Sequence, residues 1–168
     1  MSAQIGKWRG ARVIGVDRHV LHPDAPAAPA LDEFFLLETK TLDSIARAAT
    51  EGRGAEVVFD TVGGPMFEPA LKGLAAGGRQ LVIASAGSRR VSFDLIDFYH
   101  NESRLLGVDT RARDAIASAS LLEALVPFFE QGTFRAPQID RVLALSDGVA
   151  AYQEVASGQV HGRLVLDP

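Results

Sequence analysis

The sequence has 168 residues, of which 47% are hydrophobic and 23% are charged, and its mean hydropathy is +0.10. These values indicate one globular domain, with at most a small appendage, and exclude a disordered chain. The formal charge of −4 argues against nucleic-acid binding. No apolar run reaches the roughly 18 residues that span a bilayer, and the first residues contain no signal-peptide core. Because cysteine is absent, disulfides and cysteine-ligated zinc are excluded, and we expect a cytoplasmic protein that binds neither nucleic acid nor membrane.

Short apolar runs alternate with helical stretches along the chain, which is typical of a parallel sheet covered by helices. The runs are rich in β-branched residues and lack polar alternation, as expected of strands buried on both faces. A proline-rich loop at residues 19–29 separates the first two strands. In chain order, the predicted elements of the first half are the end of a helix at 4–9, strands at 12–17 and 33–37, a helix between Thr41 as N-cap and Gly52 as its stop, and a strand at 55–61.

In the second half of the sequence, glycines and prolines mark where predicted elements begin and end. Gly63 and Gly64 end a strand, and Pro65 fits the first turn of the helix that follows. A long amphipathic helix is predicted at residues 112–131, where Pro127 should kink it or mark an irregular last turn. The other predicted elements are a helix presenting Phe67, Ala70, Leu71 and Leu74 before Gly77, a strand at 80–84, a short helix at 93–100, strands at 104–108, 139–145 and 162–166, and a helix at 146–157 with Ser146 as N-cap.

Four segments together carry a family resemblance. The first predicted strand ends in an acid, Asp17, and residues 52–64 read Gly-Arg-Gly-Ala-Glu-Val-Val-Phe-Asp-Thr-Val-Gly-Gly. Residues 74–83 read Leu-Ala-Ala-Gly-Gly-Arg-Gln-Leu-Val-Ile, and the fourth segment is residues 150–166. On these motifs, the sequence resembles the C-terminal, nucleotide-binding half of the medium-chain dehydrogenase/reductase superfamily, which includes the zinc-type alcohol dehydrogenases. The zinc-free, quinone oxidoreductase-like branch is the most similar.

This resemblance implies an α/β fold, a Rossmann-like parallel sheet with helices on both faces. It divides the chain into a truncated dinucleotide-binding domain at residues 1–135 and a strand–helix–strand extension at 136–168, which in the family packs back on the catalytic domain. The family's glycine-rich turn, which opens the first helix, has no match in this sequence. We therefore expect the first strand, the phosphate loop and the N-terminal GroES-like domain to be absent.

The missing strand is the central one in the family strand order 3-2-1-4-5-6. Its absence leaves two buried strands, at residues 13–16 and 57–59, with open edges that invite pairing or aggregation. Three alternatives follow from this. The two strands pair directly, another chain donates the missing strand, or the sequence is one piece of a longer protein.

The resemblance also implies that NAD(H) or NADP(H) binds at the carboxyl ends of the strands. Asp17 matches the acid that accepts hydrogen bonds from the adenosine ribose and favours NAD, whereas Arg18 can pair with the 2′-phosphate of NADP. Residues 61–63 would lie on the adenosine or pyrophosphate side and residues 84–86 toward the nicotinamide. The alternatives are that Asp17 only caps a turn, that the glycines of these two segments only make tight turns, and that Arg163 is a solvated surface residue. The implied cofactor-binding residues are Asp17, Arg18, Thr61, Val62, Gly63, Ala84, Ser85, Ala86 and Arg163.

The leading functional interpretation is the cofactor domain of an NAD(P)-dependent oxidoreductase, which transfers hydride to or from a carbonyl, alcohol or activated alkene. As an isolated chain it is expected to be inactive. No catalytic acid or base can be named, because Ser85, Tyr99 and Tyr152 have suitable side chains but no supporting spacing. His19 and His22 lack carboxylate or thiolate partners at ligand spacing, so no metal site is predicted.

Two other interpretations remain open. The chain is either a non-catalytic Rossmann-like remnant that acts as a binding or assembly module, or one subunit of a split enzyme whose N-terminal half is another chain. The predicted strand at residues 104–108 is an edge strand in the family, and it commonly pairs with its copy in a second subunit. A homodimer through this strand is therefore expected. Asp60 and Asp109 lie at or near strand ends and are interpreted as turn or capping residues.

Overall fold

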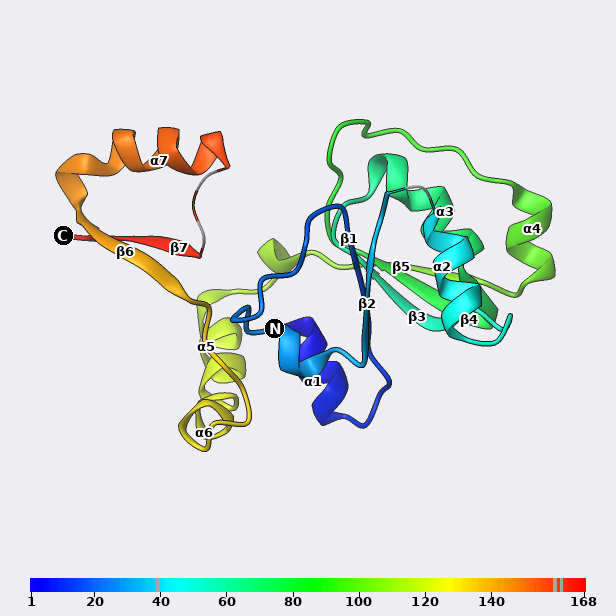
Figure 1. Cartoon of the computed structure of the whole chain (residues 1–168), viewed down its shortest axis with the longest axis horizontal. Coiled ribbons are helices and arrows are strands. Elements are labelled where there is room, and N and C mark those ends of the chain that lie inside the picture. Colours follow the sequence, from blue (N-terminus) through cyan, green and yellow to red (C-terminus); the bar gives the residue numbers. More distant parts are fainter. Residues whose placement is uncertain (39, 159, 161) are drawn as a thin grey trace. The chain divides into compact units, whose positions relative to one another are not determined.

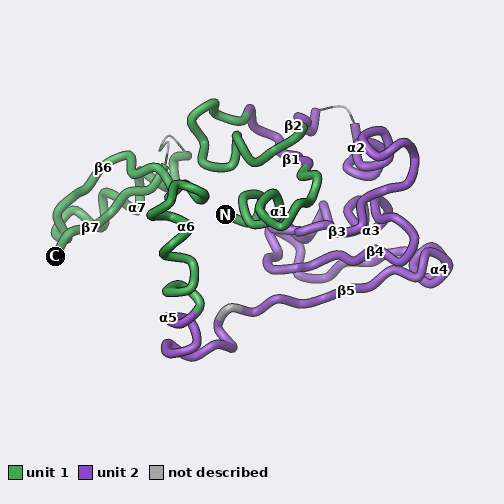
Figure 2. The backbone as a smooth tube through the Cα atoms, turned by 90° about the horizontal axis from the view of Figure 1, so that it is seen from below, with its two compact units in different colours: residues 1–13, 21–33, 121–168 green, residues 14–20, 34–120 purple. Residues whose placement is uncertain are grey.

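A computed structural model describes residues 1–38, 40–158, 160 and 162–168, with the backbone alone described at residue 110. The chain divides into two compact units, which are coloured separately in Figure 2. Unit 1 consists of Met1–Val13, Leu21–Glu33 and Leu121–Pro168, and unit 2 consists of Ile14–Val20 and Phe34–Ser120. None of the helices in the described ranges has both the length and the apolar character needed to cross a bilayer.

Helices and strands alternate along most of the chain, as the sequence predicts (Figure 1). The helices are α1 (Ser2–Trp8), α2 (Leu42–Ala49), α3 (Phe67–Lys72), α4 (Leu95–His100), α5 (Ala115–Glu123), α6 (Val126–Glu130) and α7 (Gly148–Ser157). The strands are β1 (Ile14–Asp17), β2 (Glu33–Leu36), β3 (Ala55–Asp60), β4 (Leu74–Val82), β5 (Arg104–Gly107), β6 (Ile139–Ala144) and β7 (Arg163–Asp167).

Unit 2 contains a three-stranded parallel sheet in the order β3-β4-β5. Val58 lies opposite Gln80, and Gln80 lies opposite Leu105, so these side chains share one face of the sheet. This face packs against α3 and the segment that leads into α4. The packed cluster consists of Phe67, Leu71 and Leu74 with Val58, Val82, Phe93, Phe98 and Leu105.

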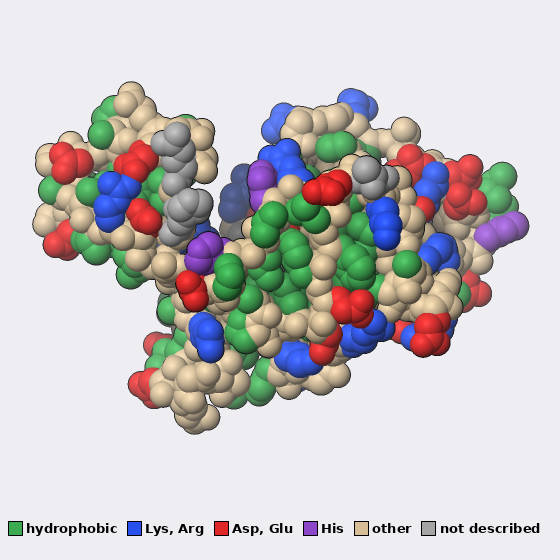
Figure 3. Space-filling view, viewed as in Figure 1, with side chains coloured by type: hydrophobic (Ala, Val, Ile, Leu, Met, Phe, Trp, Pro, Cys, Tyr) green, Lys and Arg blue, Asp and Glu red, His purple; other side chains and the backbone are tan. Residues whose placement is uncertain are grey.

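The other face of this sheet carries a row of apolar side chains. Phe59 lies opposite Leu81, which lies opposite Leu106, and Phe59 and Leu106 are 39% and 44% exposed. Apolar side chains are also open to solvent over the region of β1 and β2 in Figure 3. The sheet of unit 2 is therefore well covered on one face only.

β1 and β2 form a separate two-stranded sheet. The Asp32 amide donates to the Val13 carbonyl and the Leu37 amide donates to the Asp17 carbonyl, so the two strands run in the same direction. Among the described residues β1 pairs with β2 and β3 pairs with β4, and β1 does not pair with β3. The alternative in which the two open strands close up on each other is therefore wrong. The α/β fold with parallel strands is confirmed.

In unit 1, an aromatic cluster joins α1 to α6 and the segment after it. The Trp8 ring lies 4.8 Å from the Phe128 ring and 5.9 Å from the Phe134 ring, measured between centroids. Gln4 Oε1 accepts from the Arg135 amide, and its Nε2 donates to the Arg135 carbonyl. The Lys7 ammonium hydrogen-bonds Asp32 and lowers the pKa of that carboxyl below its ordinary value of 3.8. Polar contacts thus support this apolar cluster.

The C-terminal part of unit 1 is the expected strand–helix–strand extension. β6 pairs in parallel with β7, and α7 connects them. Gly162 has a φ of +125°, and a Cβ there would lie 2.6 Å from the Gln138 carbonyl oxygen, so the chain enters β7 at a position that only glycine fits. The two compact units do not test the predicted domain boundary after residue 135, which stays a prediction.

Three details differ from the sequence-based prediction. Leu74, predicted on a helix, begins β4 and pairs with Ala55, because the helix ends at Lys72. The long helix predicted at 112–131 is broken into α5 and α6, with Pro127 in the first turn of α6, where its missing N–H costs no intrahelical bond. Ser146 is not the N-cap of α7, because it lies within a 3-10 turn at Leu145–Asp147.

Candidate functional site

A cavity of about 1170 Å³ lies in unit 2 where β1 and β3 end. Val16 and Asp17 of β1 contribute to its wall, as do residues 58–62 of β3 and the loop after it. A third part of the wall comes from residues 86–88, which follow β4. Ligands bind in open parallel sheets at this carboxyl edge, and the volume is large enough for a cofactor-sized molecule. This cavity is therefore the candidate binding site.

Asp17 occupies the end of β1 and faces this cavity. Its Oδ1 accepts from the His19 amide at 2.9 Å, and the Nδ1 atom of the His19 ring lies 3.3 Å from the same oxygen. The side chain is nevertheless 57% exposed, and its Oδ2 has no hydrogen-bond partner among the described residues. One oxygen thus caps the turn, and the other is available to a ligand.

Asp60, the last residue of β3, organises the turn beneath the cavity. It is only 5% exposed, and its Oδ1 accepts from the amides of Val62 at 3.0 Å and Gly63 at 2.8 Å. Its Oδ2 accepts from Gln80 Nε2 at 2.9 Å. A buried carboxylate is stable only when its oxygens are satisfied in this way. The turn role expected for Asp60 is confirmed, and the link to Gln80 fixes this turn to β4.

The loops that follow β3 and β4 touch each other through backbone atoms. Gly63 has a φ of +63°, and a Cβ there would lie 2.2 Å from the Ala84 carbonyl oxygen. A Cβ on Gly64 would lie 2.3 Å from the Ala86 carbonyl oxygen, and the Ala86 amide donates to the Val62 carbonyl at 2.7 Å. Both positions therefore require glycine, because each has a positive φ and each lies where two backbone segments approach closely.

The structure brings together some of the residues implied by the family resemblance. Gly63 lies against Ala84 and Ser85 next to the cavity, and the Ser85 hydroxyl donates to the Ser88 carbonyl. Arg163 lies in β7, which belongs to unit 1, and it is not among the described residues that line the cavity. The implied residues that line the cavity are Asp17, Arg18, Thr61, Val62 and Ala86.

Sequence reasoning did not assign two basic side chains that line the same cavity. His19 follows Arg18, and Arg90 belongs to the loop after β4. His19 was considered only as a metal ligand, although its amide and ring both meet Asp17. Arg90 stands in a Ser-Arg-Arg run, and its position after a strand that ends at the site was the signal that could have identified it. The wall therefore combines the exposed carboxylates of Asp17 and Glu68 with the guanidinium groups of Arg18 and Arg90.

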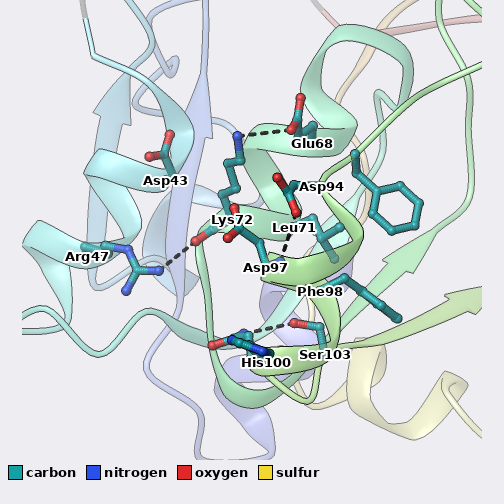
Figure 4. Close-up of a pocket in the computed structure, with 12 residues that line it drawn as sticks. Asp43, Arg47, Glu68, Leu71, Lys72, Asp94, Asp97, Phe98, His100 and Ser103 are labelled. Carbon is teal, nitrogen blue, oxygen red and sulfur yellow. Dashed lines mark hydrogen bonds and ion pairs between the residues drawn. The ribbon is translucent and has the colours of Figure 1, made fainter.

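A second cavity, of about 430 Å³, lies among α2, α3 and α4 and is shown in Figure 4. Lys72 Nζ lies 3.0 Å from Glu68 Oε1, and this hydrogen bond raises the pKa of Lys72 above its ordinary value. The Arg47 guanidinium donates to the Lys72 carbonyl at 2.9 Å. The Asp97 amide donates to Asp94 Oδ1. Protein groups already satisfy much of this polar wall, and none of the implied cofactor residues belongs to it.

The residues present fit part of a nicotinamide dinucleotide. The exposed Oδ2 of Asp17 is a hydrogen-bond acceptor that suits ribose hydroxyls, and Arg18 beside it suits a phosphate. The sequence provides no glycine-rich strand–turn–helix for the pyrophosphate. For zinc, the described part of the chain contains no group of three or more His, Asp or Glu side chains that could hold a metal ion, so we assign no zinc ligands to these residues.

Comparison with known proteins supports the same relationship. The chain is 28% identical to the D-arabinose 1-dehydrogenase (NADP(+)) of Saccharolobus solfataricus over 156 residues, which are 93% of this chain and 42% of that protein. It superposes on the crystal structure of an NAD-dependent alcohol dehydrogenase with a TM-score of 0.79 and 26% identity, covering 99% of this chain and 47% of that one. A quinone oxidoreductase from Pseudomonas syringae shares the fold, with a TM-score of 0.76, 20% identity and coverage of 99% and 52%.

The chain spans about half the length of these relatives. A family model described as zinc-binding dehydrogenase matches residues 31–166, which includes β2 to β7 and the loops that follow β3 and β4. Because this model covers most of its length, the chain belongs to the zinc-binding dehydrogenase family. This result agrees with the resemblance that the sequence motifs carry.

Proposed function

We propose that this chain forms the nicotinamide-dinucleotide-binding part of an NAD(P)-dependent oxidoreductase. The observation that carries the proposal is the exposed carboxylate of Asp17 at the end of β1, in the same cavity as the carboxyl end of β3. An acid at this position of a parallel sheet is what adenosine ribose hydroxyls require. The names of two relatives support a nicotinamide cofactor, since one specifies NADP(+) and the other NAD.

In this proposal the residues of the chain bind the nucleotide and orient it. Asp17 accepts from the ribose, and Arg18 pairs with a 2′-phosphate when NADP is the nucleotide. Asp60 acts as a positioning residue, because it holds the amides of Val62 and Gly63 in the turn that underlies the cavity. When bound, the nicotinamide supplies or accepts a hydride, and the second reactant is a carbonyl, an alcohol or an activated alkene.

No catalytic acid or base is part of the proposal. The Ser85 hydroxyl already donates to the Ser88 carbonyl, and the ring of Tyr99 packs edge-on against His100 at 4.6 Å. Tyr152 lies on α7 in unit 1. Binding of the nucleotide, rather than turnover, is therefore the property by which this chain is tested.

The test is a fluorescence titration of the 168-residue chain with NADH and, separately, with NADPH. We expect saturable binding of at least one nucleotide, and Asp17→Asn should weaken NADH binding about tenfold, because a charged acceptor is replaced by a neutral one. Arg18→Ala should weaken NADPH binding more than NADH binding.

Asp109→Asn is the matched control. Asp109 follows β5 as Asp17 ends β1, its Oδ1 accepts from the Arg111 amide, and it lies outside the cavity wall. This variant should bind both nucleotides as the unchanged chain does. If neither nucleotide binds, or if Asp109→Asn weakens binding as much as Asp17→Asn, the proposal is wrong, and the absence of binding would favour a non-catalytic module.

A further inference from the structure

A glutamine side chain lies buried at the centre of the sheet of unit 2. Gln80 belongs to β4, opposite Val58 of β3 and Leu105 of β5, and it is 0% exposed. Val58 and Leu105 pack against the apolar cluster of this unit. Buried parallel strands are almost continuously apolar, because burying an amide is unfavourable unless its polar atoms are paired. The side chain of Gln80 therefore has a part to play beyond packing.

The hydrogen bonds of Gln80 fix the orientation of its amide group. Nε2 donates to Asp60 Oδ2 at 2.9 Å and to the Phe67 carbonyl at 3.3 Å, whereas Oε1 has no partner among the described residues. Exchanging the two atoms would place Oε1 against two acceptors, so the opposite orientation is excluded. The unpaired Oε1 lowers stability, and an apolar side chain of similar size would lack this cost.

The two acceptors of Gln80 are the two ends of one loop. Asp60 is the last residue of β3, and Phe67 is the first residue of α3. Residues 61–66 connect them, and positions 61, 62 and 64–66 line the large cavity. A single buried amide group therefore holds both ends of a loop that forms part of the cavity wall.

Hydrogen bonds inside the loop carry the position of Asp60 further along it. Asp60 Oδ1 accepts from the amides of Val62 and Gly63, and the Met66 amide donates to the Gly63 carbonyl at 2.9 Å. Asp60 is only 5% exposed, so its carboxylate depends on these protein donors and on Gln80. Removing the donor on Gln80 would free Asp60 to move, and the loop would move with it.

We propose that Gln80 is a positioning residue of the nucleotide site, which holds the loop at residues 61–66 in place by bonding to both of its ends. Gln80 is not among the described residues that line the cavity, so it acts through Asp60 and the start of α3. The inference rests on the proposed function, because it concerns the same cavity. The unpaired Oε1 is then a loss of stability tolerated for the sake of a functional site.

Hydrogen exchange of the full chain without nucleotide is the first test. Gln80→Met keeps a flexible side chain of similar size and removes both donors. We expect the amides of Val62, Gly63 and Met66 to exchange about tenfold faster in this variant, because the carboxylate that orders the loop loses a hydrogen bond. The Val108 amide, which donates to β4, is the reference for the sheet and should change by less than about twofold.

Nucleotide affinity is the second readout. Gln80→Met should weaken NADH and NADPH binding by the same factor, about five- to tenfold, because the loop lies beneath both nucleotides. Leu105→Ala is the matched control, since Leu105 packs against the same cluster from β5 and does not line the cavity. It should lower the midpoint of denaturant unfolding and leave both affinities unchanged. Equal loss of affinity in the two variants would overturn the inference, because it would show that Gln80 only supports the core.

A double variant tests whether Gln80 and Asp60 act as a unit. Asp60→Asn keeps an acceptor for the amides of Val62 and Gly63 but removes the charge. Adding Gln80→Met to Asp60→Asn should weaken nucleotide binding by less than the product of the two separate factors. Losses that multiply fully would show that Gln80 acts independently of Asp60, which would contradict the proposal.

A measurement on the unchanged chain does not depend on the folding of any variant. The side-chain amide protons of Gln80 should exchange at least about a hundredfold more slowly than those of Gln131 and Gln153, which are exposed. Equal rates would overturn the inference, as would unchanged exchange at Val62 and Gly63 in Gln80→Met. If the unchanged chain binds neither nucleotide, it is the proposed function that fails, and the exchange rates still decide whether Gln80 holds the loop.

Discussion

Gly63 lies where the loop after β3 meets the loop after β4, and its substitution tests that contact. Its φ is +63° and a Cβ would lie 2.2 Å from the Ala84 carbonyl oxygen. Gly63→Ala should lower the free energy of unfolding by about 2–5 kcal/mol, because the positive φ costs about 1–2 kcal/mol and the backbone clash about 1–3 kcal/mol. Denaturant unfolding measures the change.

Gly52 provides the matched control within the same unit. It has a φ of +86°, but a Cβ there would have nothing within 4 Å. Gly52→Ala should therefore cost only the conformational penalty, about 1 kcal/mol. Equal destabilisation by the two substitutions would show that the contact between Gly63 and Ala84 contributes nothing.

At the scale of single residues, the sequence predicts which positions lie at the carboxyl edge of the sheet, but not which of their atoms are free. Asp17 was correctly expected at a strand end, yet only the structure shows that Oδ1 caps a turn and Oδ2 is open. The link from Asp60 to Gln80 joins residues 20 apart on different strands. Such a contact depends on register, which no local pattern reveals.

At the scale of secondary-structure elements, the outer edge of β5 leads to a prediction about self-association. We propose that the chain forms a homodimer through residues 104–108, since β4 is the sole neighbour of β5 in the described sheets. The Val108 amide donates to the Val82 carbonyl, so the amide of Gly107 faces away from β4. Gly107→Pro removes that donor and should convert the dimer into a monomer in sedimentation velocity.

Gly107→Ala is the control for this prediction. A Cβ at Gly107 has nothing within 4 Å, and the amide is retained, so this variant should sediment as the unchanged chain does. A chain that is monomeric at high concentration before any substitution, or a proline variant that remains dimeric, would refute the pairing of β5 with its copy.

Apolar periodicity predicted the elements better than it predicted their ends. The helix caps illustrate the reason. Thr41 precedes α2 as expected but makes no side-chain capping bond, whereas Asp94 accepts from the amides of Ile96 and Asp97 at the start of α4. Several residue types can cap a helix, and local geometry decides which of them does so. In the same way, Pro127 was recognised as an interruption, but the break it accompanies separates α5 from α6.

For the whole molecule, the sequence predicted the class of fold, which the structure confirms. Alternating strands and helices indicated the parallel arrangement of the strands. The sequence left open whether β1 and β3 would pair with each other, because no local pattern shows which distant strands become neighbours. In the described residues β1 and β3 are not paired with each other, and the ends of both strands line the cavity in which we propose that the nucleotide binds.

The central claim is that a nicotinamide dinucleotide binds where β1 and β3 end, and amide NMR of the chain during titration with NADH and NADPH tests it most directly. The account predicts saturable shifts concentrated at residues 16–19, 60–62 and 86–88, which line the large cavity. Amides near Arg47 and His100, in the smaller cavity, should remain unchanged. Shifts confined to the smaller cavity, or no saturable shift with either nucleotide, would contradict the claim.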